Sequence, residues 1–293
     1  MFPRSFLFVP GDSERKMIKG TGSGADALIL DLEDSVAVDR LSVARTMVLS
    51  FLRTHAQPRN QKLWVRINPL GSGKELDDLA TVVAGAPDGV LVPKCDSPED
   101  IRTVDHYLTV LERRENVAAG SIGIIPVATE TATSLFALGQ YLDVSTRLLG
   151  LTWGAEDLAT ALGASTNKAD DGVTLSFTFQ MARSLCLLGA KSAKLYAIDS
   201  VNPDFRDSKA LDLEVQRARK DGFTSKMAIH PDQVAVINEG FMPSQAEIER
   251  AQAIIQAFQN STGVGAVQID GIMLDKPHLQ QAMNLLAAAG ISP

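Results

Sequence analysis

Short apolar runs recur along the chain, and a polar or charged residue follows almost every one of them. Runs of four to seven mostly aliphatic residues, bounded by turn-forming or acidic residues, are typical of strands that are buried on both faces. The chain contains eight such runs. We predict strands at residues 5–9, 27–30, 63–67, 89–92, 122–127, 147–151, 192–198 and 225–229.

Between these runs, apolar residues recur at the three-to-four spacing of a helix that buries one face. The clearest such stretches are 36–52, 99–114, 175–188 and 212–220. Alternating strands and helices predict a parallel sheet covered by helices, and eight repeats favour closure into an α/β fold of the (β/α)8 TIM-barrel type. An open, doubly wound sheet is the alternative. In a barrel, the residues that follow the strands share one rim, so their polar side chains are expected to form one site.

The last part of the chain lies outside the eight repeats. A helix is predicted at 244–258, a glycine-containing linker at 263–271, and a further amphipathic stretch after it. We therefore predict a catalytic barrel domain at 1–262 and a separate C-terminal segment at 263–293.

Composition narrows the class of protein. With 45% hydrophobic and 22% charged residues, the chain is an ordinary globular protein. The formal charge of −7 and the lack of a long basic run argue against nucleic-acid and membrane partners. The apolar run near the start is too short for a signal peptide or a membrane span, so we expect a cytoplasmic protein. Two cysteines, Cys95 and Cys186, are too few for a disulfide framework or a metal cluster.

Two carboxylates are the strongest candidates for chemistry. Glu130 and Asp157 each follow a predicted strand, and adjacent strand ends can bring such groups together. Mg2+ takes few protein ligands, prefers oxygen and leaves positions for water and substrate. The alternative is that both acids sit in first helical turns, where the helix dipole favours negative charge. We favour metal binding for this pair and the dipole interpretation for Glu156.

Other charged residues at the same rim suggest a site for an anion. Arg66 ends a strand, where its planar fork could grip a carboxylate or enolate, although an ion pair with rim acids is the alternative. Asp31 and Glu33 could orient Arg66 or metal-bound water. Asp34 is better suited to capping the helix near residue 36. Lys94 is expected to balance charge rather than to form a Schiff base.

Seven motifs, in order along nearly the whole chain, resemble the citrate lyase beta-subunit family, which includes malyl-CoA and citramalyl-CoA lyases. The motifs are Arg4-Ser5-Phe6-Leu7-Phe8-Val9-Pro10-Gly11, Leu30-Asp31-Leu32-Glu33-Asp34, Val65-Arg66-Ile67-Asn68, Pro93-Lys94, Glu130-Thr131, Gly154-Ala155-Glu156-Asp157 and Ile229-His230-Pro231. The resemblance implies a barrel of the phosphoenolpyruvate/pyruvate superfamily, Mg2+ as the cofactor, and a homotrimer or hexamer.

The resemblance also implies roles for individual residues. The metal ligands would be Glu130 and Asp157. Arg66 would hold the oxyanion and the substrate carboxylate, with Asp31 and Glu33 supporting it. These three residues and Asp275 form the catalytic set that we predict. The substrate contacts that we predict are Arg66, Lys94, Ala155 and Glu156.

The tail is similar to the lid of the CoA-dependent members. In Met273-Leu274-Asp275-Lys276-Pro277, the aspartate would reach the active site of a neighbouring subunit and handle the proton at the thioester α carbon. Without the resemblance, Asp275 is a good N-cap for a helix at 277–288. Segment 263–293 is thus expected to be a lid or oligomerisation segment. Arg15, Lys16 and Lys19 are candidates for the CoA phosphates, with a solvated helix face as an equal alternative.

Together these features predict a Mg2+-dependent lyase that cleaves or forms a 3-hydroxyacyl-CoA thioester, giving an acyl-CoA plus glyoxylate or pyruvate. The substrates are small molecules. A metal-dependent aldolase that acts on free hydroxy-oxo acids is one alternative. A citrate lyase beta subunit that is active only within a larger complex, with an acyl-carrier partner, is another. The sequence does not separate malyl from citramalyl substrates, because one methylene changes the discrimination by only about 1–3 kcal/mol.

Overall fold

A computed structural model describes residues 2–55, 57–261 and 265–291 of the chain. It divides into two compact units, Met1–Asn238 and Glu239–Pro293. The division therefore falls before the helix predicted at 244–258, which the sequence had assigned to the barrel domain. Among the described residues, none of the helices has the length and apolar character needed to cross a membrane.

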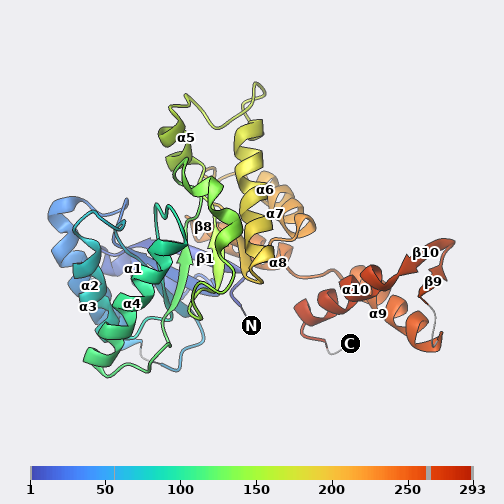
Figure 1. The fold of residues 1–293 in the computed structure, drawn as a ribbon, viewed down its shortest axis with the longest axis horizontal. Helices are drawn as coiled ribbons and strands as arrows, with labels where there is room; N and C mark the ends of the chain where they lie inside the picture. Colours follow the sequence, from blue (N-terminus) through green and yellow to red (C-terminus); the bar gives the residue numbers. More distant parts are fainter. Residues whose placement is uncertain (1, 56, 262–264, 292–293) are drawn as a thin grey trace. The chain divides into compact units, whose positions relative to one another are not determined.

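The first unit is built on eight parallel strands (Figure 1). Along the sheet they run in the order β5-β4-β3-β2-β1-β8-β7-β6. Parallel bridges from Ile124 to Leu148 and from Val127 to Thr152 join the two end strands, so the sheet closes as a (β/α)8 barrel. The strands are β1 Ser5–Pro10, β2 Ala27–Asp31, β3 Lys62–Arg66, β4 Gly89–Val92, β5 Gly123–Pro126, β6 Gly150–Thr152, β7 Tyr196–Asp199 and β8 Ser225–Ala228. All eight predicted strands are confirmed.

Alternate side chains of these strands fill the interior of the barrel. The interior cluster contains Phe6, Ala27, Ile29, Trp64, Leu91, Ile125, Val127, Ile198 and Met227, all nearly inaccessible to solvent. Trp64 lies so close to Gly89 that a Cβ there would come within 2.2 Å of the indole. Glycine is therefore required at the start of β4, because no larger residue leaves room for this ring.

Helices cover the outside of the barrel. The α-helices of this unit are α1 Glu14–Thr21, α2 Leu41–Thr54, α3 Glu75–Val82, α4 Pro98–Glu115, α5 Glu156–Leu162, α6 Phe177–Ser192, α7 Ser208–Asp221 and α8 Asp232–Gly240. Short 3-10 turns lie at Val38–Arg40, Val83–Gly85, Ser134–Phe136 and Leu138–Gln140. The last two occupy the connection between β5 and β6. Helix α6 runs to Ser192, so β7 begins four residues later than predicted.

The seam between β5 and β6 is held by a buried ion pair. Arg147, just before β6, makes two bonds of 2.6 Å to the carboxylate of Glu112 on α4. That carboxylate also accepts the backbone N–H groups of Gly120 and Ile122, at 2.7 and 3.0 Å. All four bonds therefore fix α4 against the place where the barrel closes.

The second unit contains α9 Gln245–Asn260, the antiparallel hairpin β9 Ala266–Ile269 and β10 Ile272–Asp275, and α10 Lys276–Ala288. The prediction of a linker at 263–271 is wrong for residues 266–271, and residues 263–264 lie outside the described part. Asp270 and Gly271 form the turn with φ angles of +51° and +78°. Two successive positive φ angles match the twist of a tight hairpin, which is why Asp-Gly is favoured there. The hairpin and the two helices bury a common apolar cluster that includes Ile254, Val267 and Leu286.

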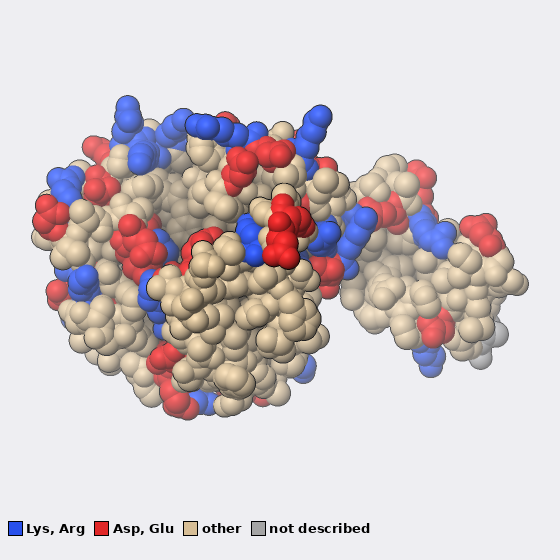
Figure 2. Space-filling model, turned by 90° about the horizontal axis from the view of Figure 1, so that it is seen from above, with Lys and Arg blue, Asp and Glu red and all other residues tan. Residues whose placement is uncertain are grey.

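Charged side chains of both signs are interspersed over the visible face of the molecule (Figure 2). Neither sign forms a broad continuous area there. On this face, a site for an anionic substrate would therefore have to be a local arrangement of a few side chains.

Candidate active site

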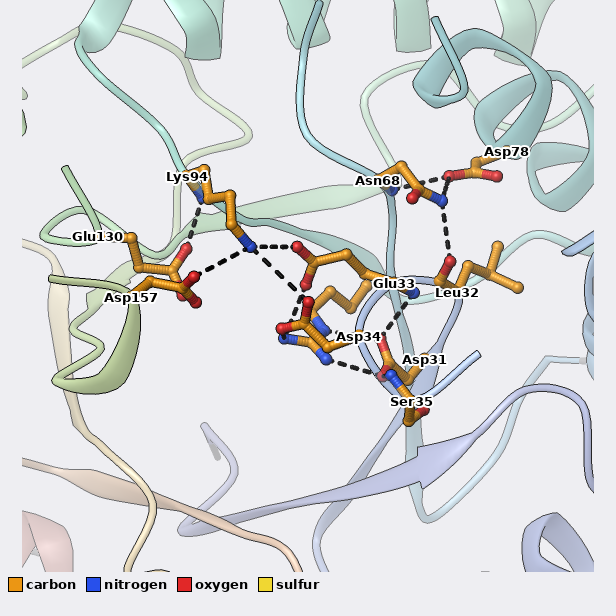
Figure 3. A network of polar contacts seen from close by, with 11 residues as sticks. Asp31, Leu32, Glu33, Asp34, Ser35, Asn68, Asp78, Lys94, Glu130 and Asp157 are labelled. Carbon is orange, nitrogen blue, oxygen red and sulfur yellow. Dashed lines mark hydrogen bonds and ion pairs between the residues drawn. The ribbon is translucent and has the colours of Figure 1, made fainter. Parts of the chain in front are cut away.

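Five charged side chains come from the carboxyl ends of five successive strands. Asp31 and Arg66 are the last residues of β2 and β3, Lys94 follows β4, Glu130 follows β5, and Asp157 lies in the first turn of α5 after β6. Residues widely separated in sequence meet there because parallel strands end at the same rim. The side chains form one continuous network of polar contacts (Figure 3).

Arg66 is fixed by a bidentate ion pair. Its Nε and Nη2 donate to the two carboxylate oxygens of Asp31 at 2.6 and 2.7 Å, and its guanidinium lies over the ring of Phe8. Asp31 also accepts the backbone N–H groups of Glu33 and Ser35. Burial on its own would raise the pKa of Asp31, but Arg66 and these donors hold it below its ordinary value. Asp31 therefore stays ionised and orients Arg66.

Glu33 connects Arg66 to Lys94. One of its oxygens lies 2.9 Å from Arg66 Nη1, and the other accepts a very short bond from Lys94 Nζ. Burial raises the pKa of Glu33, and the charges of Arg66 and Lys94 oppose that rise. Asp34 lies 3.4 Å from Arg66 Nη1 and 3.9 Å from Lys94 Nζ.

The expected cap at Asp34 is therefore wrong. The following helical turn begins at Val38 after Ala37, which makes no side-chain cap, and α2 begins at Leu41. The cations of two neighbouring strand ends attract the Asp34 carboxylate in place of the local backbone.

Glu130 and Asp157 lie beside each other at the rim (Figure 3). The backbone N–H of Lys94 donates to Glu130 Oε2 at 2.5 Å, and Lys94 Nζ lies 3.5 Å from Asp157 Oδ1. A Cβ on Gly154 would come within 3.1 Å of Glu130 Cγ and Oε1, so the glycine leaves room for this carboxylate. Burial, with the charge of Asp157, raises the pKa of Glu130 to about 8.

The charges at the rim fit a divalent cation. Three further acids, Asp31, Glu33 and Asp34, accompany the pair formed by Glu130 and Asp157. Arg66 and Lys94 balance two of these five carboxyl groups. The excess is three negative charges when all five are ionised, and two while Glu130, with its pKa of about 8, keeps its proton at neutral pH. Within the described ranges, no three His, Cys, Asp or Glu side chains form a complete ligand cage. Two carboxylates with open positions suit Mg2+, which retains several water ligands and binds through few protein groups.

The other predicted site residues lie at varying places around this network. Ala155 is the N-cap of α5, and Glu156, in its first turn, accepts a 2.8 Å bond from Asn167. Arg15, Lys16 and Lys19 are exposed on α1, the helix that follows β1. Their roles at a substrate or at CoA phosphates remain predictions.

Asp275 belongs to the second unit, where it precedes α10 as its N-cap residue. Its Oδ1 lies 2.5 Å from Nδ1 of His278. Its backbone N–H lies 3.3 Å from the same nitrogen. Asp275 thus occupies the N-cap position that the capping interpretation gave it, and its catalytic role remains a prediction.

Sequence reasoning missed the residues that hold the rim from below. Asn68 donates to the carbonyl of Leu32 and to Asp78, which is itself paired with Arg45, so β2 and β3 are tied at their ends. Thr129 Oγ1 accepts the backbone N–H of Gly154 at 3.0 Å. These bonds join residues that are distant in sequence, so no spacing of residues within a short stretch of the chain predicts them.

Asp199, the last residue of β7, is the centre of a buried network. It accepts a 2.6 Å bond from the indole of Trp153, which precedes the Gly154 turn, and it pairs with Arg183 and Lys226. Burial would raise the pKa of Asp199, but the charges of Lys226 and Arg183 hold it below its ordinary value. The network fixes the chain as it enters the segment that carries Asp157.

The model of the HpcH/HpaI aldolase/citrate lyase family matches residues 4–231. The chain belongs to this family. It is 32% identical over 291 residues to citrate lyase subunit beta of Escherichia coli (strain K12), with 99% of this chain and 94% of that protein covered. It is 32% identical over 302 residues to the mitochondrial citramalyl-CoA lyase of Homo sapiens, covering 98% and 85%. It is 34% identical over 289 residues to (3S)-malyl-CoA thioesterase of Cereibacter sphaeroides (strain ATCC 17025 / ATH 2.4.3), covering 98% and 94%.

A solved structure of this family has the same fold. The crystal structure of protein CitE from Mycobacterium tuberculosis in complex with magnesium, acetoacetate and coenzyme A superposes with a TM-score of 0.80. The two sequences are 29% identical, and 98% of each chain is covered. The predicted resemblance is thus confirmed, and the chain is an enzyme of a lyase family.

Proposed function

We propose that this enzyme is a Mg2+-dependent carbon–carbon lyase that cleaves or forms a 3-hydroxyacyl-CoA thioester of the malyl-CoA or citramalyl-CoA type. The products of cleavage are an acyl-CoA and glyoxylate or pyruvate. The observation that carries this proposal is the convergence of Glu130 and Asp157 with Lys94 at one rim of the barrel, where Glu33 joins Lys94 to Arg66. The names of the relatives, a citramalyl-CoA lyase and a malyl-CoA thioesterase, support the same substrate class.

Glu130 and Asp157 would hold the metal, which acts when bound as a Lewis acid on the oxygen that changes from hydroxyl to carbonyl. An anionic 2-oxo acid that approached the rim alone would meet an excess of negative charge, even while Glu130 keeps its proton. The charges of the rim therefore favour substrate binding after a cation has bound.

Arg66 would stabilise the negative charge that develops on the substrate. Asp31 occupies its Nε and Nη2, so the guanidinium keeps one orientation while its Nη1 edge faces Glu33 and Asp34. A donor held in place before the reaction stabilises a developing oxyanion without the cost of reorganisation. Lys94 lies within reach of the same region and would meet the substrate carboxylate.

During cleavage, the hydroxyl proton would pass to water and the electron pair left on that oxygen would form the new carbonyl bond. The carbon–carbon bond would break, and its electron pair would move into the thioester enolate. Asp275 of a neighbouring subunit, in its protonated form, would then give a proton to the α carbon of that enolate. Arg15, Lys16 and Lys19 would contact the phosphates of CoA. The roles of these four residues rest on the resemblance, as does a trimeric or hexameric assembly, which light scattering would measure. The cytoplasmic location that we propose rests instead on the short apolar run near residue 6, which does not have the length of a signal peptide or a membrane span.

The test is turnover of malyl-CoA and citramalyl-CoA with and without Mg2+, with detection of glyoxylate and pyruvate. Wild type, Asp157→Asn and Asp275→Ala would be compared, with Asp232→Asn, an exposed acid on α8, as the control. Metal-dependent release of the oxo acid that is lost in the first two variants and kept in the control is the expected result.

Two other results would overturn the proposal. Turnover of the free hydroxy-oxo acid, undiminished in Asp275→Ala, would identify an aldolase that does not use CoA. No turnover by the isolated chain, with recovery when a co-purifying acyl carrier is added, would identify a subunit of a larger complex.

A further inference from the structure

Lys94 has an unusual backbone for its residue type. It follows β4 and Pro93, and its φ angle of +50° lies in the left-handed region that residues with a Cβ avoid. In this conformation its backbone N–H donates to Glu130 Oε2 at 2.5 Å. Disfavoured backbone conformations persist where the surroundings impose them, and they cluster at functional sites.

The side chain of Lys94 turns toward a different set of acids. Its Nζ makes the short bond to Glu33 and lies 3.5 Å from Asp157 Oδ1 and 3.9 Å from Asp34 Oδ1 (Figure 3). One residue therefore contacts both carboxylates of the proposed metal site, Glu130 through its backbone and Asp157 through its ammonium group. The ammonium is a compact charge with three donors on a flexible stem, so it can leave one acid and keep another.

We propose that the Lys94 ammonium is a built-in counter-ion that competes with Mg2+ for Asp157 and so sets the metal affinity of the site. This inference rests on the proposed function. Without metal, the ammonium keeps Asp157 and Glu33 together in spite of their like charges. When Mg2+ binds, the ammonium gives up Asp157 and remains on Glu33, which lies on the side of Arg66.

Loss of the Lys94 ammonium should affect Mg2+ affinity in the opposite direction from loss of a residue that only supports the fold. A positive charge a few ångströms from a divalent cation weakens binding of that cation. At a solvent-screened rim, removal of the positive charge should lower the Kd of the cation about tenfold. Loss of the ammonium should therefore tighten Mg2+ binding while it destabilises the metal-free enzyme. A residue that only supports the fold would weaken both.

The experiment compares the full chain with Lys94→Met, which keeps the apolar stem and loses the charge. Titration calorimetry with MgCl2 should give a Kd about tenfold lower for the variant than for wild type. In EDTA, the variant should melt at a lower temperature than wild type, and saturating Mg2+ should raise its Tm by more than that of wild type.

Lys62→Met is the matched control. Lys62 is also partly exposed and pairs with an acid, Asp88 at 3.0 Å, but it begins β3, at the end of the strand opposite Arg66. Its loss should leave the Mg2+ Kd unchanged. Lys94→Gly supplies a second test, because it keeps the N–H that contacts Glu130, relieves the left-handed backbone and should also tighten Mg2+ binding.

Unchanged or weaker Mg2+ binding in both Lys94 variants, with normal binding in Lys62→Met, would overturn the inference. If wild type binds no Mg2+ in the same titration, the proposed metal site itself fails. The two failures are therefore distinguishable.

Discussion

Gly154→Ala tests the packing around the proposed metal site with the smallest possible change. The added Cβ would lie 3.1 Å from both Cγ and Oε1 of Glu130, and 3.4 Å from Val127. Carbon contacts are most favourable at about 3.5–4.0 Å, so the Glu130 carboxylate must move by a few tenths of an ångström or more. The φ angle of Gly154 is not positive, and alanine is therefore not strained by the backbone itself.

The displacement matters because Mg2+ demands oxygen ligands at about 2.0–2.1 Å in nearly ideal octahedral geometry. Disturbed support of a metal ligand typically costs about 10–100-fold in affinity, which corresponds to roughly 1.4–2.7 kcal/mol. We expect a Kd for Mg2+ raised by this factor in titration calorimetry, with kcat/KM falling in parallel at limiting metal.

Gly139→Ala is the control for this prediction. Gly139 also lacks a positive φ angle, and a Cβ there would meet no atom within 4 Å. The control should bind Mg2+ as wild type does. If Gly154→Ala also binds Mg2+ as tightly as wild type, then Glu130 is not a ligand whose position this glycine protects, and the reasoning is refuted.

Three further changes have defined outcomes. Arg66→Lys loses the planar fork that pairs with Asp31, and kcat/KM on the CoA ester should fall by about 100-fold while circular dichroism stays unchanged; unaltered kinetics would contradict the oxyanion role. Glu112→Ala leaves Arg147 buried without this partner, and urea denaturation should show that the free energy of unfolding falls by about 3–5 kcal/mol. An unchanged free energy of unfolding would contradict a buried ion pair at the seam. For Asp199, the pKa is lower in the folded than in the unfolded state, so its contribution is present at neutral pH and is lost as pH falls through and below about 4. The stability difference between wild type and Asp199→Asn should therefore shrink from pH 7 to pH 3, and a difference that grows on acidification would contradict this assignment.

The barrel could be predicted because its signals are local. Strands buried on both faces form short apolar runs, and all eight were found within a few residues. The start of β7 was placed too early because Ser192-Ala193-Lys194-Leu195 alternates polar and apolar residues and leads directly into the apolar run of β7, whereas α6 in fact continues to Ser192. Periodicity alone does not separate a short apolar run at a helix end from a strand.

The prediction for Asp34 failed because a side chain can bond either to the backbone near it in sequence or to side chains far along the chain. Asp34 was given a capping role by its neighbours in sequence, but Arg66 and Lys94, about 30 and 60 residues away, attract it in the fold. The hairpin in the second unit was different. Its Asp270-Gly271 turn is a local signal, but with Gly263 and Gly265 shortly before it the stretch was interpreted as a glycine-containing linker. Asn68, Thr129 and Asp199 act through bonds to residues that are distant in the sequence, for which a sequence offers no spacing rule.

The position of β1 has a consequence for biosynthesis. This strand pairs with β2 on one side and with β8 on the other, where Ser5 is in register with Lys226. About 220 residues must be synthesised between the two partners, which takes roughly 10–45 s at ordinary rates of translation. During that time the apolar run at residues 6–9 keeps one open edge, and open edges template pairing between chains. The nascent protein is therefore expected to depend on chaperones during synthesis. Its soluble yield should be higher when the rate of synthesis does not exceed the capacity of the available chaperones.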